Sequence, residues 1–248
     1  ELLLAQRISS PFVLAAHPIS PDRQTALYCV QPLLDGETME ARLARGVPSL
    51  KLGVEQAIRL IRAVAALHRL EVIHRDIKPE NVMLTADGGL KLIDLGVARL
   101  PRVEDFHGDE IPGTPGFMAP EQFEGNAGDE LTDQFALGVT LFRWFTGKWP
   151  FGEQEAFQRP RFGKVVPPST YRPEIPSWLD DAIVTAIQPD PDARFGDTIE
   201  LLRTLEGGGA TEIGPRRPVS LHDRNPARFW QLVSLGLAMA LALSLMFR

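Results

Sequence analysis

The stretch that most constrains this chain is residues 72–96, where polar side chains are concentrated between apolar runs. Residues 74–81 form a segment rich in charged and hydrogen-bonding side chains. Short apolar runs follow at 82–84 and 90–93, and the residues at 86–89, Ala-Asp-Gly-Gly, are a strong turn sequence. We therefore expect a polar loop followed by a two-stranded hairpin.

This hairpin would gather three oxygen-bearing side chains. Because its second strand runs back toward the loop, Asp94 at the strand end should lie close to Asp76 and Asn81. Such oxygen ligands suit a hard cation such as Mg²⁺, which proteins usually hold through a few side chains plus substrate phosphates. The sequence predicts a magnesium site here; the alternative is a surface hairpin with solvated charges.

Composition narrows the class of protein. The 248 residues are 44% hydrophobic and 23% charged, as in ordinary globular proteins. The net charge of −6 argues against a nucleic-acid-binding protein, which would usually be basic. Cys29 is the single cysteine, so an intrachain disulfide is impossible and a reducing compartment is expected.

The spacing of the polar stretch resembles a known family. His-Arg-Asp-x-Lys-Pro-x-Asn at 74–81, followed by Asp-Leu-Gly at 94–96, resembles the catalytic and metal-binding segments of eukaryotic-type (Hanks-type) protein kinases. The resemblance covers residues 1–206 and implies an α+β, protein kinase-like fold with a mostly helical large lobe. It also implies ATP and Mg²⁺ (or Mn²⁺) as cofactors and a protein Ser or Thr hydroxyl as acceptor.

The resemblance implies a chemical role for five residues. Asp76 would accept or orient the proton of the attacking hydroxyl, and Lys78 would contact the γ-phosphate. Asn81 and Asp94 would hold Mg²⁺. Thr114 would hydrogen-bond Asp76 and Lys78. A Lys at position 78 resembles Ser/Thr kinases more than tyrosine kinases, and Asp-Leu-Gly in place of Asp-Phe-Gly is bacterial in style.

It implies a supporting role for five others. His74 would be a packing and hydrogen-bonding residue, and Arg75 a docking point for an activation-loop anion. Asp133 would anchor backbone amides around the His-Arg-Asp loop. Glu121 would pair with Arg194 and lock the activation segment to the large lobe, a buried pair whose disruption costs several kcal/mol.

The expected activation segment, residues 97–121, has no phosphoacceptor between Gly96 and Gly113. Acidic residues occur there instead: Glu104, Asp105, Asp109 and Glu110. A phosphate carries about two negative charges near neutral pH. Our hypothesis is that one of these carboxylates replaces it opposite Arg75; a solvated acidic loop is the alternative.

Residues 1–30 would be the remnant of a small lobe. They would contain the end of the C helix and two strands, at 12–16 and 26–30. By resemblance, Glu1 could be the C-helix Glu that pairs with the ATP-binding Lys. No Gly-x-Gly-x-x-Gly occurs in the chain, which begins with Glu inside an apolar pattern. We interpret it as a fragment whose Gly-rich loop and ATP-binding Lys precede residue 1.

Residues 31–206 would contain the hinge and the large lobe. Gln31 and Leu33 belong to the expected hinge, where backbone groups would meet adenine. Five helices are predicted, at 37–44, 54–70, 131–145, 178–187 and from Gly196 or Asp197 to 206. Thr132 and Ser177 are the predicted N-caps of the third and fourth.

The C-terminal part reads differently. Residues 207–228 form a polar linker with four Arg, and 229–247 are almost wholly apolar. About nineteen helical residues span a bilayer core, and Trp230 would lie at the interface. The Arg cluster predicts a single-pass protein of the inner (cytoplasmic) membrane with a cytoplasmic kinase domain. A buried amphipathic helix is the alternative.

Two functions compete. The first is a membrane-anchored Ser/Thr protein kinase, resembling bacterial chains that carry a PP2C-type phosphatase domain upstream. The second is a membrane-tethered pseudokinase scaffold that transfers nothing. Retention of five catalytic-type residues argues against the scaffold, and the upstream sequence would discriminate. The chain as printed is predicted to be weakly active or inactive.

Overall fold

The computed structural model describes residues 10–17, 30–95, 98, 113–152, 161–208, 230 and 234. The chain divides into two units, Glu1–Ile213 and Gly214–Arg248. In the second unit only Trp230 and Ser234 are described, and both are helical.

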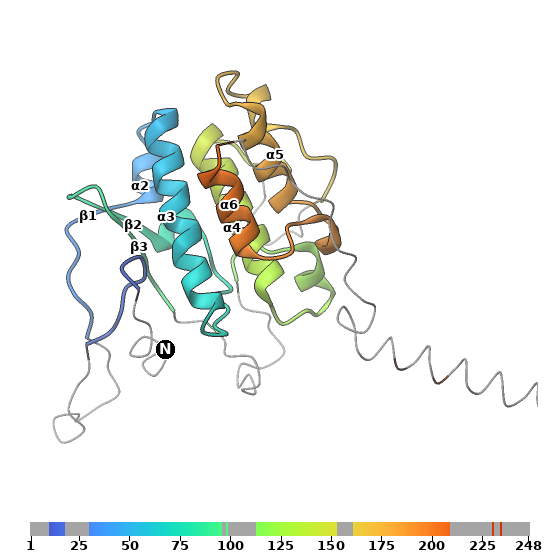
Figure 1. The fold of residues 1–248 in the computed structure, drawn as a ribbon, viewed down its shortest axis with the longest axis horizontal. Helices are drawn as coiled ribbons and strands as arrows, with labels where there is room; N and C mark the ends of the chain where they lie inside the picture. The colour runs from blue at the N-terminus through green and yellow to red at the C-terminus, as the bar shows by residue number, and fades with distance from the viewer. Residues whose placement is uncertain are drawn as a thin grey trace, which may run out of the picture. The chain divides into compact units, whose positions relative to one another are not determined.

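The first unit contains a small antiparallel sheet (Figure 1). Its strands are β1 (Gly36–Thr38), β2 (Val82–Thr85) and β3 (Leu90–Leu92), in the order β1-β2-β3. Gly36 pairs with Thr85, and a Cβ atom built on Gly36 would stand 2.2 Å from the Leu84 carbonyl oxygen. Only glycine fits this approach, so the residue fixes where β1 meets the hairpin.

The described residues of this unit include five α-helices. They are α2 (Met39–Leu43), α3 (Leu50–His68), α4 (Glu130–Thr146), α5 (Ser177–Ala186) and α6 (Thr198–Glu206). Figure 1 shows the sheet on one side of α3 and helices α4, α5 and α6 on the other. Single 3₁₀ turns connect them at Pro79–Asn81, Pro120–Glu124, Pro168–Thr170 and Pro191–Ala193.

Helix α4 lies at the centre of the core. Every residue from Thr132 to Phe142 is buried, as expected for a helix that is mostly apolar around its circumference. At Gly138 a Cβ atom would stand 2.5 Å from the Ile187 side chain, so this glycine allows close packing at the end of α5. Such a helix is a rigid support for loops that bond to it.

The structure confirms the five predicted helices but corrects two N-caps. Asp129, not Thr132, caps α4: its carboxylate accepts from the backbone N–H groups of Leu131 and Thr132. The Thr132 hydroxyl in turn accepts from Asp129 N, so Thr132 completes a capping box. Ser177 is the first residue of α5, and Pro176 occupies the cap position.

The sheet also differs from expectation. The strand predicted at 12–16 is wrong as a strand, since only Val13 forms a bridge, to Leu92. Leu14 N donates to Leu92 O (2.9 Å) and Leu92 N donates to Phe12 O (2.7 Å), which ties the segment to β3. In addition, residues 36–38, expected to be hinge and helix, form β1.

Several predictions fall outside the described residues: Glu1, most of the strand at 26–30, the acidic residues 104–110, and the apolar segment 229–247 apart from Trp230 and Ser234. Among the residues that are described, no helix combines the length and apolar character needed to cross a membrane.

Candidate active site

The predicted catalytic loop is held from below by α4. Asp133 is 1% exposed. Its Oδ2 accepts from His74 N and its Oδ1 from Arg75 N, each at 2.8 Å. Arg75 has a left-handed backbone, with φ +67°, which is costly for a non-glycine residue. These bonds offset that cost, and the predicted anchoring contact of Asp133 is confirmed.

Above this anchor, three side chains form a closed triangle. Lys78 Nζ lies 2.7 Å from Asp76 Oδ2 and donates to Thr114 Oγ1 at 2.7 Å. The Thr114 hydroxyl donates to Asp76 Oδ1 at 2.8 Å. The two segments are 36 to 38 residues apart in sequence. The predicted contacts of Thr114 are therefore present, and they fix the carboxylate and the ammonium side by side.

Asn81 is oriented by the same carboxylate. Its Nδ2 donates to Asp76 Oδ2 (3.0 Å) and to Asp76 O (2.8 Å). With both contacts made by the amide nitrogen, the Oδ1 oxygen remains as the acceptor. The backbone continues the link, because Ile93 N donates to Asn81 O at 2.9 Å. This bond brings the end of the hairpin to the loop, as predicted.

Asp94 follows directly after this bond. It is exposed and left-handed, with φ +64°. Its charge and that of Asp76 both act to raise the pKa of His74, against the larger effect of burial. The sequence predicts that Asp76, Asn81 and Asp94 lie close together. The bond from Ile93 N to Asn81 O holds the residue before Asp94 against the loop and supports this prediction.

The donor set fits a hard cation. Asn81 offers an amide oxygen and Asp94 an exposed carboxylate, which are the oxygen donors that Mg²⁺ prefers. Within the described part of the chain, no three or more His, Cys, Asp or Glu residues gather as a metal site. Mg²⁺ in phosphoryl-transfer sites needs only one or two carboxylates besides phosphate oxygens and water.

His74 is a buried neutral imidazole beneath this site. Burial lowers its pKa from the ordinary value, although the carboxylates of Asp133 and Asp76 act in the opposite direction. Asp76 N donates to His74 Nδ1 at 3.3 Å, and His74 Nε2 lies 3.4 Å from Ile93 O. An Nε2–H tautomer satisfies both contacts. The predicted packing and hydrogen-bonding role of His74 matches these contacts.

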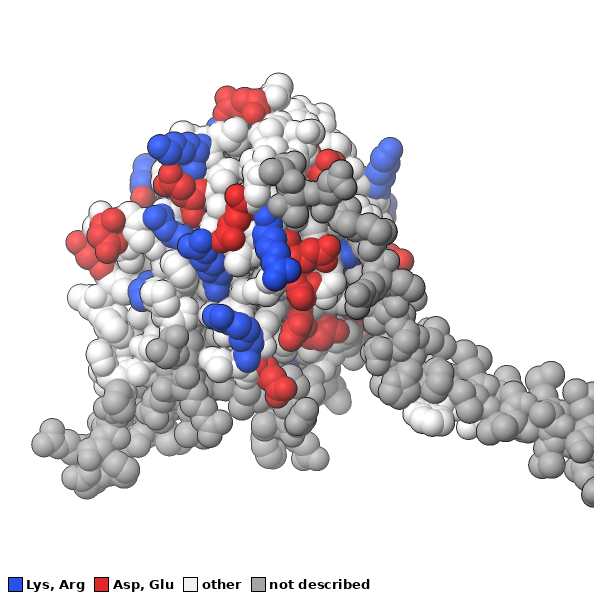
Figure 2. Space-filling view, viewed as in Figure 1, with Lys and Arg blue, Asp and Glu red and all other residues white. Residues whose placement is uncertain are grey.

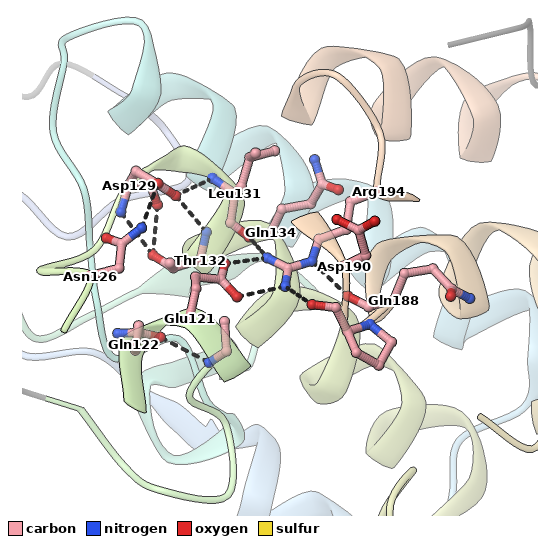
Figure 3. A network of polar contacts seen from close by, with 12 residues as sticks. Glu121, Gln122, Asn126, Asp129, Leu131, Thr132, Gln134, Gln188, Asp190 and Arg194 are labelled. Atoms are coloured by element: carbon pink, nitrogen blue, oxygen red, sulfur yellow. Dashed lines mark hydrogen bonds and ion pairs between the residues drawn. The ribbon is translucent and has the colours of Figure 1, made fainter. Parts of the chain in front are cut away.

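The activation segment ends in a second buried network (Figure 3). Arg194, 1% exposed, donates to both carboxylate oxygens of Glu121 at 2.7 and 2.8 Å. The guanidinium also donates to Leu131 O (2.9 Å) and Gln188 O (2.8 Å). The predicted Glu121–Arg194 pair is confirmed. Through Arg194, the 3₁₀ turn Pro120–Glu124 is connected to Leu131 at the start of α4 and to Gln188 just after α5.

The Arg75 side chain packs against the segment before α4, at Ala127 and Gly128. It is 5% exposed, and its Nη1 donates to Ala127 O at 3.4 Å. A Cβ atom on Gly128 would come within 3.0 Å of the Arg75 side chain. Whether Arg75 also meets an activation-loop carboxylate stays a prediction, because residues 104–110 lie outside the described ranges.

The two hinge residues are not brought to the catalytic triangle by any contact that the structure gives. Leu33 is fully exposed and Gln31 half-buried. A cavity of about 570 Å³ borders Leu33, Asp35 and the turn between β2 and β3. Its lining contains neither Asp76 nor Asn81, so the chemistry is not in this cavity. The adenine contacts of Gln31 and Leu33 stay predictions.

Sequence reasoning missed two polar contacts that support the site. His68 Nε2 lies 3.0 Å from Asp133 Oδ2. Gln134 exchanges hydrogen bonds with Phe195, through Nε2 to its carbonyl (3.2 Å) and Oε1 from its N–H (3.0 Å). The signals in the sequence were a histidine near the end of the helix predicted at 54–70 and a glutamine in the mostly apolar helix predicted at 131–145. Polar side chains that a helix buries need hydrogen-bond partners.

Comparison with known proteins agrees with this geometry. Residues 1–203 match the protein kinase domain. The chain is 30% identical over 251 residues to the serine/threonine-protein kinase PknE of Mycobacterium tuberculosis, covering 93% of this chain and 44% of that protein. It is 29% identical to a probable serine/threonine-protein kinase, CPE1738, of Clostridium perfringens, covering 72% of this chain and 27% of the relative.

A third relative is the serine/threonine-protein kinase PrkC of Bacillus subtilis, 27% identical over 79% of this chain and 31% of its own length. The chain thus spans less than half the length of these curated relatives. The domain match covers most of the chain and includes the catalytic loop, the hairpin and the Glu121–Arg194 pair. The chain belongs to the protein kinase family.

Proposed function

We propose that the protein is a serine/threonine kinase that transfers the γ-phosphate of ATP to a protein hydroxyl. The observation that carries the proposal is the triangle of Asp76, Lys78 and Thr114, with Asn81 bonded to the same carboxylate. Relatives named serine/threonine-protein kinase support this acceptor class.

Each member of the triangle has a separate task. Asp76 accepts the hydrogen bond of the incoming hydroxyl and aligns it for in-line attack. Lys78 places positive charge beside the transferring phosphoryl group. Thr114 holds both in register through its hydroxyl. Asn81 Oδ1 and Asp94 would hold Mg²⁺, which supplies charge neutralisation on the phosphates when bound.

Replacing one carboxylate tests the proposal. In the full-length protein, Asp76→Asn should lower kcat for phosphorylation of casein by about 10²–10⁴-fold, the usual contribution of a positioned base. The matched control is Asp181→Asn, an exposed carboxylate on α5, which should leave kcat unchanged. Full activity of Asp76→Asn would contradict the proposal.

The competing proposal is a pseudokinase scaffold. The printed chain lacks a Gly-x-Gly-x-x-Gly sequence, which covers the phosphates in protein kinases. We expect weak or no ATP–Mg²⁺ binding by residues 1–248 alone, measured by calorimetry. Micromolar affinity would contradict that expectation. A full-length protein that neither binds ATP nor phosphorylates casein would favour the scaffold.

We also propose membrane anchoring through residues 229–247, with the kinase domain on the cytoplasmic side and a PP2C-type phosphatase domain upstream. The support is the nearly continuous apolar run and the preceding arginines. Deleting 229–248 should move the full-length protein from the membrane pellet to the supernatant. Unchanged pelleting would exclude this segment as the anchor.

A further inference from the structure

A buried hydrogen-bond chain connects α6 to the catalytic loop. Thr198, the first residue of α6, places its Oγ1 2.9 Å from His68 Nδ1. The other ring nitrogen of His68, Nε2, lies 3.0 Å from Asp133 Oδ2. Asp133 in turn accepts from the backbone N–H groups of His74 and Arg75. All three side chains are buried: Thr198 is 2%, His68 9% and Asp133 1% exposed.

The carboxylate dictates what His68 must present. A buried carboxylate accepts hydrogen bonds and cannot donate them, so a stable contact requires a proton on His68 Nε2. If that proton moved to Nδ1, the Nε2 lone pair would face Asp133 Oδ2 at 3.0 Å and the contact would become repulsive. The position of one proton on His68 therefore decides whether Asp133 has its third donor.

The hydroxyl of Thr198 influences which nitrogen of His68 carries the proton, because it lies 2.9 Å from Nδ1. A hydroxyl can donate to an unprotonated Nδ1, which leaves the ring proton on Nε2, where Asp133 needs it. Without the hydroxyl, Nδ1 would be buried without a partner, and the ring could recover one only by rotating or by moving its proton. Either change weakens the bond to Asp133.

We propose that Thr198 is a positioning residue for the catalytic loop, acting by keeping His68 protonated at Nε2 and directed at Asp133. The inference rests on the proposed kinase function for its effect on activity. It touches neither substrate nor cofactor. Through His68, which lies 130 residues earlier in the sequence, Thr198 joins the first turn of α6 to Asp133 and so to the loop of Asp76.

The test uses the full-length protein labelled with ¹⁵N-histidine. The printed chain has five histidines, and loss of one signal in His68→Gln identifies the His68 resonances. In the wild type, the ¹⁵N shift should show a protonated Nε2. In Thr198→Val, a variant of nearly equal shape, the Nε2 signal should move toward the unprotonated position, and Thr198→Ser should restore it.

Kinetics give a second readout. With casein as substrate, Thr198→Val should lower kcat by about tenfold, which corresponds to about 1.4 kcal/mol of barrier, with KM for ATP unchanged. Thr198→Ser should recover kcat. The matched control is Thr204→Val, which removes another buried hydroxyl of α6 that bonds only within the helix, to Glu200 O at 3.0 Å; it should resemble the wild type in both readouts.

Specific outcomes overturn the inference. An unprotonated Nε2 in the wild type does so without any variant. So does a Thr198→Val protein with wild-type tautomer and kcat, or a loss of kcat that Thr198→Ser does not recover. If Thr198→Val does not fold, as judged by circular dichroism, Thr198→Ala replaces it under the same criteria. A wild type with no kinase activity would contradict the proposed function, while the His68 spectrum would still decide the tautomer.

Discussion

Asp133 and Arg194 are two buried charged residues at the start of α4: Asp133 belongs to the helix and Arg194 donates to its Leu131 carbonyl. Their hydrogen-bond partners differ in kind. The Asp133 carboxylate accepts from two backbone N–H groups and from His68. The Arg194 guanidinium has a bidentate carboxylate partner and additional carbonyl acceptors, and it lies 4.9 Å from the centre of the Phe135 ring.

The difference separates two tasks. Because its partners are backbone amides of the catalytic loop, Asp133 determines loop conformation, so its loss should affect chemistry. Arg194 instead joins segments up to 73 residues apart, so its loss should affect stability. A surface ion pair provides the reference for both: Figure 2 shows acidic and basic side chains interspersed on the face where α3 and α6 lie, and Arg62–Glu206 joins these helices.

The largest expected effect is on the Arg194 network. Arg194→Leu would leave Glu121 and several carbonyls without their donor. Breaking a buried pair from one side usually costs about 3–5 kcal/mol, and urea denaturation should show a loss of that size in the free energy of unfolding. A loss below about 1 kcal/mol would mean that the Arg194 network contributes no more to stability than an exposed ion pair does.

Asp133→Asn should have a smaller effect on stability and a larger one on catalysis. The amide has one acceptor oxygen, so its NH₂ group must face at least one donor of His68, His74 or Arg75. We expect a loss of about 1–3 kcal/mol in the free energy of unfolding, the cost of a buried unsatisfied group. We also expect kcat, calculated per folded molecule, to fall more in Asp133→Asn than in Arg194→Leu. Equal losses of kcat in the two variants would contradict the assignment of catalysis to Asp133 and of stability to Arg194.

The pH dependence of stability tests the catalytic loop that Asp133 holds, because His74 in this loop is buried. Burial lowers the pKa of His74, so below the ordinary value of 6.5 the unfolded chain takes up a proton that the folded chain refuses. This contribution to stability is present above pH 6.5 and is lost as the pH falls toward the folded pKa. Urea titrations at successive pH values should show a decline of up to about 1.4 kcal/mol per pH unit from this group.

The variant His74→Gln serves as the comparison for that slope. Its unfolding free energy should decline less steeply between pH 7 and pH 5 than that of the wild type, because the glutamine does not titrate. Parallel pH profiles for the two proteins would show that His74 does not contribute to the acid sensitivity.

The smallest effect is expected for the surface reference. Arg62 and Glu206 approach to 2.7 Å, but their side chains are 46% and 38% exposed. A double-mutant cycle with Arg62→Gln and Glu206→Gln should give a coupling of about 0.2–1 kcal/mol, as exposed pairs do. A coupling comparable to that at Arg194 would mean that burial is not what distinguishes the two.

The sequence predicted the site better than the contacts that support it. The His-Arg-Asp segment, the hairpin and Glu121–Arg194 could be predicted because a specific resemblance assigns partners to residues far apart. His68–Thr198 has no such guide, and its 130-residue separation leaves no periodic pattern. The pairing becomes apparent only when α3 and α6 pack together.

The fold errors have local causes. Thr132 and Ser177 are good N-cap residues by type, yet both helices begin earlier than predicted. The Asp129 carboxylate caps α4, and Pro176 stands at the cap position of α5 without a side-chain hydrogen bond. The run at 12–16 has apolar residues typical of a strand but pairs with β3 only around Val13. In β1, Gly36 and Glu37 have low strand propensity, so pairing with β2 overrides the local preference.

The anchoring of the catalytic loop by Asp133 has a consequence for how the protein folds. The bonds from this carboxylate to His74 and Arg75 span 59 and 58 residues, and Thr114 reaches Asp76 across 38. Closing such long loops must be paid for in chain entropy before the bonds form, which slows folding. We expect amide protection of His74 and Arg75 to appear only with burial of α4, so that a nascent chain acquires helix α3 early and its catalytic geometry late.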